Sequence, residues 1–339
     1  MAAKASKVKD EEKKGVFQEK LKVLETRYGK GSIVLGKDVS EELEVVTTGS
    51  ISWDLATKCG GTPVGKLIEY QGMESSGKST GGLHTMSEFQ KAYPDDEVVL
   101  CDYEQSFDRQ YATAVGVNVD RLTILQPESL EDGYNMIQDL IETGKVRLVV
   151  IDSHTAGMPK KVVEGDVGDA SIGLQARVNS QALGKIKPLL KANRCTVIGI
   201  SQIRQDIGSM GEVNKSTGGL AWKFYCDMRV KFAKVQTDKE KESNKTEINI
   251  IKNKCASPWG KAVLYIDWGV GISKMQELLD MGSELKLINK AGSWYTIGEQ
   301  KIQGDEAAVQ FLKDNENFAL ELQAQILQLL NPELNTIEK

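Results

Sequence analysis

The octapeptide GMESSGKS at residues 72–79 decides the fold of this 339-residue chain. It matches the pattern GxxxxGK[ST] and follows the apolar run LIEYQ at residues 67–71, which predicts a strand before it and a helix after it. In such a loop backbone N–H groups surround phosphate oxygens, Lys78 reaches the β- and γ-phosphates, and Ser79 Oγ ligates Mg²⁺. A nucleoside-triphosphate site is therefore expected, with a plain Gly/Ser surface turn as the alternative. The residues expected to bind ATP here are Gly72, Glu74, Ser75, Ser76, Gly77, Lys78, Ser79 and Thr80.

Three further apolar runs predict neighbouring strands: VVLCD at 98–102, LVVID at 148–152 and TVIGIS at 196–201. Short apolar runs that alternate with amphipathic stretches are typical of parallel strands joined by helical crossovers. The carboxyl ends of parallel strands line the binding crevice of such a sheet. The fold class is therefore α/β, and the polar residues expected in the crevice are Asp102, Glu104, Asp152 and Gln202.

Two of these carboxylates suit phosphoryl chemistry. Asp152 ends its strand and is placed to hold the Mg²⁺ shell together with Ser79. Hydrolysis also needs a group that orients the attacking water, and Glu104, just beyond the VVLCD strand, could reach it. On position alone, a solvated loop carboxylate at Glu104 is equally compatible.

Composition places the chain among soluble cytosolic proteins. Hydrophobic residues make up 40% and charged residues 27%, and no apolar run approaches the roughly 18 residues of a membrane span. The N-terminal MAAKASKVKDEEKK lacks the apolar stretch of a secretory signal. The five cysteines form no CxxC pair, which argues against a disulfide framework or a zinc site. A net charge of −5 speaks weakly against nucleic acid, although the distribution of charge matters more than its sum.

The flanks of the predicted core differ from it in pattern. FQEKLKVLETRY at 17–28 carries apolar residues at helical spacing and ends before Gly29, which predicts a helical N-terminal lobe. MRVKFAKV at 228–235 and TEINIIKNK at 246–254 alternate in polarity around a charged turn, which predicts a β-hairpin extension. A compact α/β lobe with a helical close at 305–330 is expected from about Met275.

Seven segments together resemble bacterial RecA recombinases, in order along the chain from about residue 17 to 330. They are GMESSGKST, CDYEQSFDRQY, LVVIDS, EGDVGDASIGLQARVNSQAL, SQIRQDIG, STGGLAWKFY and IIKNK. A generic phosphate-loop protein would share the GKS tripeptide and the aspartate but not the EGDVGD loop, the TGG segment or the KNK pair. The resemblance implies a RecA-like core with a mostly parallel central sheet, helices on both faces and a hairpin extension. Its expected parts are an N-terminal oligomerisation lobe at 1–36, an ATPase core at 37–273 and a C-terminal α/β lobe at 274–339.

The resemblance also assigns roles around the nucleotide. It implies that Glu104 activates the attacking water and that Asp108 and Tyr111 contact the adenine, on which a flat aromatic ring stacks at little entropic cost. Gln202 matches the residue that senses the γ-phosphate and relays ATP binding to the DNA loops. ATP and Mg²⁺ are the cofactors implied.

Two Gly-rich segments, 164–173 and 203–217, resemble the DNA-binding loops of the family. Without the resemblance, each would be a plain connector. The DNA contacts expected in and beside them are Ile172 as a wedge between bases, Gly173, Arg177, Arg204, Lys215, Ser216, Thr217, Gly218 and Gly219.

Lys252 and Lys254 match lysines that, in the family, reach across a subunit interface to the neighbour's ATP, and Lys223, Phe224 and Arg229 are expected near the same interface. A cation inserted from a second subunit makes hydrolysis depend on assembly. A lone lysine on a strand is otherwise simply solvated. These assignments rest on the resemblance.

The expected activity is that of a DNA-dependent ATPase and homologous recombinase that forms a helical filament on single-stranded DNA and exchanges strands with duplex DNA. Two alternatives stay open: a ring-forming RecA-fold motor and a non-catalytic ATP-dependent scaffold. The second loop is about one residue shorter than the usual pattern and carries SMGEVNK in place of an aromatic tip. The sequence closes at Lys339 without a long acidic tail, so we expect weaker Mg²⁺-dependent self-inhibition. Lys290 and Lys301 resemble part of a duplex-capture surface.

Overall fold

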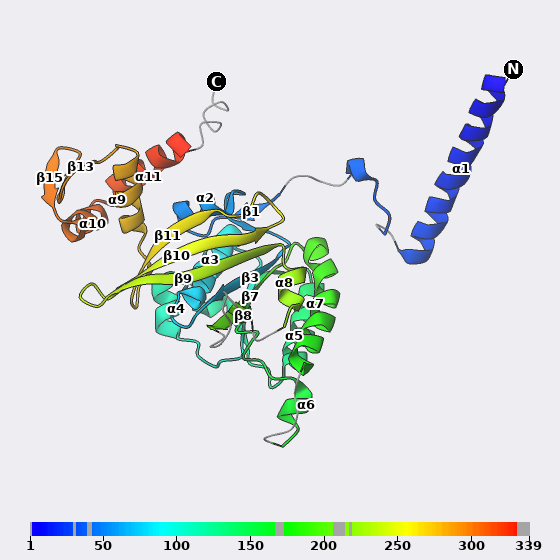
Figure 1. The fold of residues 1–339 in the computed structure, drawn as a ribbon, viewed down its shortest axis with the longest axis horizontal. Helices are drawn as coiled ribbons and strands as arrows, with labels where there is room; N and C mark the ends of the chain where they lie inside the picture. Colours follow the sequence, from blue (N-terminus) through cyan, green and yellow to red (C-terminus); the bar gives the residue numbers. More distant parts are fainter. Residues whose placement is uncertain are drawn as a thin grey trace. The chain divides into compact units, whose positions relative to one another are not determined.

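The computed structural model describes residues 2–29, 32–38, 43–166, 173–205, 214–216 and 219–330 (Figure 1). Within these ranges only the backbone is described at 2–14, 204–205 and 214–216. The chain divides into two compact units, residues 1–43 and 44–339, and each is described by itself.

The first unit contains one long helix, α1 (Ala2–Tyr28), followed by a short 3-10 helix, η1 (Gly36–Asp38). Gly29 ends α1 in the left-handed region at φ +100°, and its N–H donates to the carbonyl of Glu25 at 2.9 Å. Glycine adopts this conformation without steric cost, which explains the stop. The helix predicted at 17–28 is confirmed, and it begins earlier, at Ala2.

A ten-stranded sheet forms the centre of the second unit, counted over the described residues. Its order is β12-β11-β10-β9-β3-β7-β6-β4-β5, and β8 (Asn214–Ser216) pairs with the end of β7. The strands from β9 to β5 in this order are parallel, and β10, β11 and β12 continue the sheet in antiparallel fashion. The bounds are β3 (Leu67–Gly72), β4 (Glu97–Asp102), β5 (Leu122–Leu125), β6 (Val146–Asp152), β7 (Thr196–Gln205), β9 (Met228–Asp238), β10 (Ser243–Asn253), β11 (Lys261–Asp267) and β12 (Gly271–Ile272).

Helices cover both faces of this sheet, so its central strands are apolar on both sides. In β6, Leu148 and Val150 join one buried cluster, while Val149 and Ile151 join the other. Side chains alternate between the faces of a strand, which explains the unbroken LVVI run. On one face lie α2 (Ile51–Thr57), α3 (Lys78–Ala92) and α4 (Arg109–Val115); on the other lie α5 (Leu130–Glu142), α7 (Leu174–Asn193) and α8 (Ala221–Tyr225). The predicted α/β class, with a mostly parallel sheet and a hairpin extension, is confirmed.

Of the two glycines in the first turns of α3, Gly81 lets the helix approach the sheet closely and Gly82 does not. A Cβ on Gly81 would lie 2.9 Å from the ring of Phe232 and 3.1 Å from that of Trp53. A Cβ on Gly82 would lie 3.4 Å from the nearest side-chain atoms, an ordinary contact. Glycine lowers helix propensity by about 1 kcal/mol, so its use at 81 follows from the aromatic ring pair beneath it.

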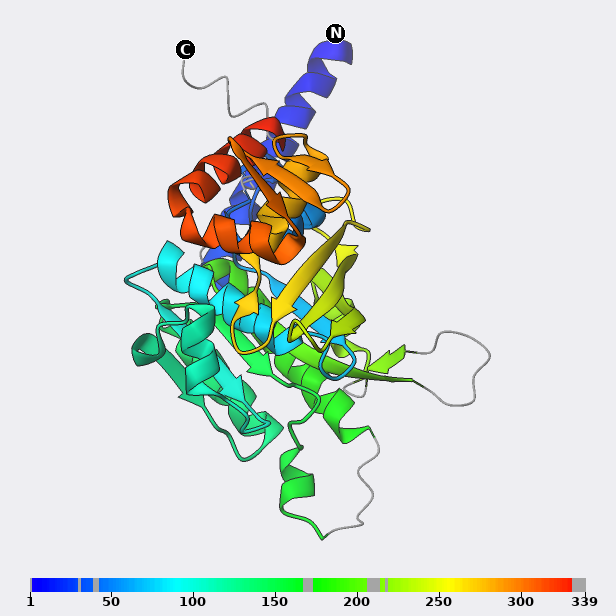
Figure 2. The same ribbon diagram turned by 90° about the vertical axis from the view of Figure 1, so that its left-hand side faces the viewer.

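The C-terminal part of the second unit, orange to red in Figure 2, has a core of its own. It includes Leu279, Tyr295, Leu312 and Ile326. The helical close predicted at 305–330 consists of two helices that meet at Asn315. The elements are α9 (Lys274–Glu284), β13 (Asn289–Ala291), β14 (Trp294–Ile297), β15 (Gln300–Gln303), α10 (Asp305–Asp314) and α11 (Glu316–Leu330).

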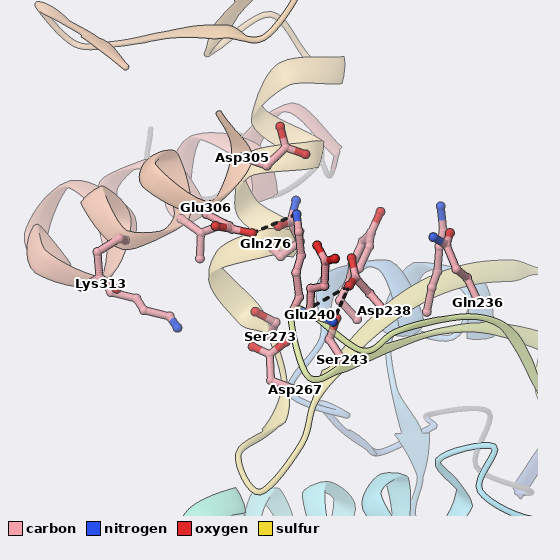
Figure 3. A pocket seen from close by; sticks show the side chains of 15 residues that line it. Gln236, Asp238, Glu240, Ser243, Asp267, Ser273, Gln276, Asp305, Glu306 and Lys313 are labelled. Carbon is pink, nitrogen blue, oxygen red and sulfur yellow. Dashed lines mark hydrogen bonds and ion pairs between the residues drawn. The ribbon is translucent and has the colours of Figure 1, made fainter. Parts of the chain in front are cut away.

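This lobe is tied to the core by polar contacts at two places. Buried Glu277 accepts hydrogen bonds from the Ser50 hydroxyl at 2.6 Å and from the N–H of Ser52 at 2.9 Å, and so caps the start of α2. At the tip of the β9–β10 hairpin, Lys241 lies 3.4 Å from Glu306 of α10. A cavity of about 490 Å³ lies beside this ion pair. Figure 3 shows the side chains that line it, most of which are charged.

The short remaining elements are β1 (Val45–Val46), β2 (Thr62–Pro63), η2 (Val119–Arg121) and α6 (Lys160–Val163). One strand boundary differs from the expectation. The TVIGIS strand was expected to end at Ser201, but β7 continues to Gln205 because residues 203–205 pair with 214–216. The base of the second Gly-rich segment is therefore a two-stranded ribbon.

Candidate functional site

The phosphate loop joins β3 to α3 in the arrangement that the motif requires. Gly72 ends the strand, Lys78 begins the helix, and Gly77 between them has φ +91° with no side-chain cap on the helix. A Cβ at Gly77 would collide with the side chain of Ile266. The uncapped helix N-terminus offers free N–H groups and a positive dipole end to an anion.

Lys78 lies within the loop rather than in open solvent. Its Nζ donates to the carbonyl of Met73 at 2.7 Å. Burial lowers the pKa of Lys78, while the nearby carboxylates of Asp152 and Glu104 work in the opposite direction. The ammonium group is thus held among acceptors at the edge of the loop, where it can turn to a phosphate oxygen.

Asp152, the carboxylate expected to hold the metal, interacts with the Ser79 hydroxyl of the phosphate loop. It ends β6, and Cys101 and Asp102 of β4 lie beside the end of that strand. Burial raises the pKa of Asp152 to about 6, with Glu104 and Asp102 adding to the effect, while the Ser79 hydroxyl and Lys78 oppose it. A desolvated carboxylate beside a hydroxyl is a donor set that suits Mg²⁺, so these residues fit the predicted ion.

Glu104 and Gln202 come together at the carboxyl ends of β4 and β7. Gln202 Nε2 donates to Glu104 Oε1 at 3.1 Å, and the hydroxyl of Ser153 donates to the same oxygen at 2.6 Å. Asp102 positions the loop that carries Glu104, because it accepts from the N–H groups of Glu104 and Phe107, both at 3.1 Å. Sequence reasoning placed Asp102 at this edge but did not predict that it binds the loop backbone, and it included Ser153 without predicting its contact with Glu104.

The residues expected to hold the base lie next to this group. Asp108 caps α4 and accepts from the N–H groups of Gln110 at 2.8 Å and Tyr111 at 3.0 Å. The phenol of Tyr111 lies 2.8 Å from Thr80 Oγ1. A cavity of about 90 Å³ is lined both by residues expected to hold the metal and by residues expected to contact the base. Its lining includes Ser79, Asp102, Asp108, Tyr111 and Asp152.

Lys252 and Lys254 do not join the phosphate loop of their own chain. In the sheet, Lys252 of β10 lies opposite Arg229 of β9, and Arg229 lies opposite Glu69 near the start of β3. The phosphate loop follows Gly72, at the other end of β3. Lys252 Nζ donates to the carbonyls of Lys223 at 2.7 Å and Phe224 at 3.1 Å. Burial, and then the charge of Lys254, lower the pKa of Lys252.

Arg229 was expected near a subunit interface, together with Lys223 and Phe224, but its side chain faces inward. It lies 2.5 Å from Glu69 and donates to Gln71 at 2.6 Å, and only 12% of it is exposed. Burial works to raise the pKa of Glu69, but His154 and Arg229 outweigh it and bring the pKa to about 2. This pairing spans 160 residues of sequence, so no local pattern signalled it.

Of the first Gly-rich segment, 164–173, the structure describes residues 164–166 and Gly173. Gly173 has φ +75° and precedes α7, and Arg177 is exposed on the first turn, with its N–H donating to the Gly173 carbonyl at 3.1 Å. Ile172 lies outside the described residues.

Of the second segment, 203–217, only the ribbon is described, where Arg204 faces Lys215 and Ile203 faces Ser216. The side chains of Arg204, Lys215 and Ser216, and the whole of Thr217 and Gly218, lie outside the described residues. Gly219 is described, with φ +82°.

Comparisons with known proteins match nearly the whole chain. The family model described as RecA N-terminal domain matches residues 15–273, and that described as RecA C-terminal domain matches residues 276–331. The chain is 42% identical to Protein RecA of Bacteroides thetaiotaomicron, over 94% of this chain and 98% of the relative. It is 40% identical to Protein RecA of Porphyromonas gingivalis, over 95% and 96%, and 40% identical to Protein RecA of Bacillus pumilus, over 94% and 93%. Among the described helices, none is long and apolar enough to cross a membrane.

Proposed function

The chain belongs to the RecA family, and from that premise we propose that it is a DNA-dependent ATPase and homologous recombinase. It polymerises on single-stranded DNA, tests duplex DNA for homology and exchanges strands, in support of DNA repair. Nucleotide binding follows from the family, and ATP with Mg²⁺ is our proposal for the ligands. We place its work in the cytoplasm, where a reducing environment suits cysteines that are all free.

The observation that carries the proposal is the convergence of Lys78, Asp152, Glu104 and Gln202 at one edge of the sheet. Lys78 and the N–H groups of the loop bind the triphosphate. Bound Mg²⁺ would neutralise charge on the phosphates, and Ser79 and Asp152 would hold it. Glu104 accepts from Gln202 and Ser153, which hold its carboxylate toward the place where a water would attack.

Gln202 gives the site a means to report the nucleotide. Its amide, which now donates to Glu104, can donate instead to a phosphate oxygen, since both are anionic acceptors. β7 continues from Gln202 into the ribbon with β8, so a shift of the amide reaches the second DNA loop through one strand. We propose that this exchange favours the DNA-binding state when ATP is bound.

Contact with DNA is proposed at both loops. Arg177 and Gly173 contact the strand from the first loop, where Ile172 separates bases. Arg204, Lys215 and the backbone N–H groups of residues 216–219 bind phosphates from the second.

Filament formation completes the site. Lys252 and Lys254 lie toward the other end of β3, so a second copy must supply them to the ATP bound by the first. We propose residues 1–36 as the oligomerisation lobe, 37–273 as the ATPase core and 274–339 as a lobe that contacts duplex DNA. An exposed apolar edge on α1, which includes Val16, Phe17 and Tyr28, suits such a contact between copies.

The test is ATP hydrolysis with and without single-stranded DNA, comparing the native chain with Glu104→Gln at matched Mg²⁺ and salt. Strong stimulation by DNA is expected, with a fall of about 10²–10⁴-fold in the variant while DNA binding persists. Glu128→Gln, an exposed carboxylate after β5, is the matched control and should behave as the native chain. Hydrolysis that ignores DNA, or a fully active Glu104→Gln, would contradict the proposal.

A further inference from the structure

The segment at residues 153–157, which we call the coupling segment, directly follows β6 and contacts the side chain of Glu104 and the backbone of Gln202. Ser153 donates to Glu104 Oε1 at 2.6 Å, and Ser153 Oγ lies 3.2 Å from Thr155 Oγ1. Thr155 Oγ1 accepts from the backbone N–H of Gln202 at 3.4 Å. A displacement of the coupling segment would therefore move the partners of Glu104 and Gln202 together.

The exit of the first DNA loop is bound to the coupling segment by one side chain. Gln175 is the second residue of α7, which begins directly after Gly173. Its Nε2 lies 3.3 Å from the carbonyl oxygen of His154, 3.1 Å from that of Thr155 and 3.0 Å from that of Gly157. A single amide thus gathers three carbonyls of the coupling segment.

The exit of the second DNA loop meets the same segment on another side. The fully buried ring of His154 stacks on that of Trp222, with centroids 4.4 Å apart and planes at 13°. Trp222 lies in α8, three residues after Gly219, and its Nε1 donates to the Tyr134 hydroxyl at 3.3 Å. The ring of His154 therefore moves with the start of α8.

The two loop exits also touch each other. A Cβ on Gly219 would lie 2.6 Å from Cβ of Ala176, which follows Gln175 in α7. Only a glycine permits this approach, and its φ of +82° adds a second reason for glycine there. The first turn of α7, the end of the second loop and the coupling segment form one packed group.

We propose that Gln175 is a positioning residue that transmits the DNA-bound state of the first loop, through the coupling segment, to Glu104 and Gln202. The inference rests on the proposed function. When DNA occupies the first loop, the first turn of α7 takes a fixed position, and the amide of Gln175 carries the three carbonyls with it. Ser153 then holds the carboxylate of Glu104, and Thr155 holds the backbone from which Gln202 projects, in the geometry that DNA-stimulated turnover requires.

The amide group, rather than the volume of the side chain, is the essential feature. Each carbonyl needs a donor when it lies away from water, and the two N–H bonds of Gln175 Nε2 are shared among three neighbouring oxygens. Methionine has similar length and flexibility but no N–H. Gln175→Met therefore removes the link and keeps most of the packing.

The experiment measures DNA-stimulated hydrolysis and DNA binding separately for Gln175→Met. Binding of a fluorescent oligo-dT strand in the presence of a non-hydrolysable ATP analogue should change little. The turnover number at saturating DNA should fall by about 5–150-fold, the usual range for a coupling between two sites, while KM for ATP and the DNA-free rate stay close to native. Gln181→Met, an exposed glutamine on the same helix, is the matched control and should match the native chain.

Three results would overturn the inference. They are native turnover at saturating DNA, a loss explained entirely by weaker DNA binding, and an equal fall in the DNA-free rate. A native chain that DNA does not stimulate would contradict the proposed function instead, so the two failures are distinguishable.

A second variant tests the contact between the coupling segment and Gln202. Thr155→Val removes the acceptor of the Gln202 N–H with little change in volume. It should reduce DNA-stimulated turnover as Gln175→Met does, and the double variant should lose less than the product of the two single losses. Should Gln175→Met fail to fold, as judged by circular dichroism, native stimulation in Thr155→Val would by itself reject the coupling segment.

Discussion

The two ends of β3 differ in what each offers to a nucleotide. At its carboxyl end, the phosphate loop, Asp152 and Glu104 form a desolvated group whose members already contact one another or shift one another's pKa. Lys252 and Lys254 lie toward the amino end of β3. Within the described residues, Lys252 Nζ donates to two backbone carbonyls and to no side chain, and Lys254 is exposed.

We infer from this difference that one chain carries a binding site and, elsewhere, the cations that would complete the site of a second copy. Burial, and then the neighbouring carboxylates of Glu104 and Asp102, raise the pKa of Asp152, so the residues at the carboxyl end only partly offset the negative charge there. The lysines have positive charge, and within the described residues neither forms an ion pair with a carboxylate. Head-to-tail assembly of two copies is the simplest way to unite them.

The largest effect is expected from the lysine pair. Lys252→Ala combined with Lys254→Ala should lower DNA-stimulated ATP hydrolysis by about 100-fold or more, because the transition-state charge loses its cations. Binding of nucleotide by the isolated chain, measured with a fluorescent ATP analogue, should stay near native. The control is Lys261→Ala, an exposed lysine at the start of β11.

Loss of nucleotide binding in the lysine double variant would break the comparison, since it would place the lysines in the site of their own chain. Hydrolysis at the native rate in the lysine double variant would also contradict the comparison, because the site at the carboxyl end of β3 would then need no lysines from a second copy.

A smaller effect is expected from the helix that carries the phosphate loop. Gly81→Ala should lower the free energy of unfolding by about 1–3 kcal/mol, because its Cβ would press on Phe232 and Trp53 and the strain exceeds the gain in helix propensity. Gly82→Ala is the matched control and should be neutral or stabilising by up to about 1 kcal/mol. Urea unfolding of both variants measures the difference. If Gly81→Ala proved as stable as Gly82→Ala, close packing would not explain the glycine.

The smallest effect concerns the charge of Asp152. In the folded chain its pKa is about 6, above the ordinary value of 3.8 for an aspartate. The folded chain therefore binds an extra proton below this pKa and loses stability as the pH rises through it. Without nucleotide, Asp152→Asn should therefore stabilise the protein, by about 1 kcal/mol more at pH 7.5 than at pH 5. Thermal unfolding at the two pH values checks this, and a pH-independent difference would mean that the carboxylate is not desolvated.

Much of this arrangement could be predicted because it depends on local pattern. The GMESSGKS loop, the four apolar strands and the order of their carboxyl ends placed Asp152, Glu104 and Gln202 at one edge before the fold was known. Parallel pairing makes that step reliable, since all such ends meet at the same side of the sheet. The roles of individual loop residues came from resemblance to the family.

The rest depends on contacts between distant residues, which leave no periodic signal. Two examples are the ion pair of Glu69 with Arg229 and the contact of the Gln175 amide with the coupling segment. Both depend on how the strands and helices pack together. Gly81 could be noticed but not explained, because its reason is the pair of aromatic rings at positions 53 and 232. The extension of β7 was missed because its partner, β8, lies beyond a Gly-rich stretch.

The most direct test of a site divided between two copies is a mixing experiment. Glu104→Gln and the lysine double variant are each assayed alone and then as an equal mixture on single-stranded DNA. Each alone should be nearly inactive, whereas about a quarter of the interfaces in a random mixture pair an intact Glu104 with intact lysines, so hydrolysis should return to a comparable fraction of the native rate. A mixture as inactive as its components, with both variants shown to co-assemble, would contradict the account.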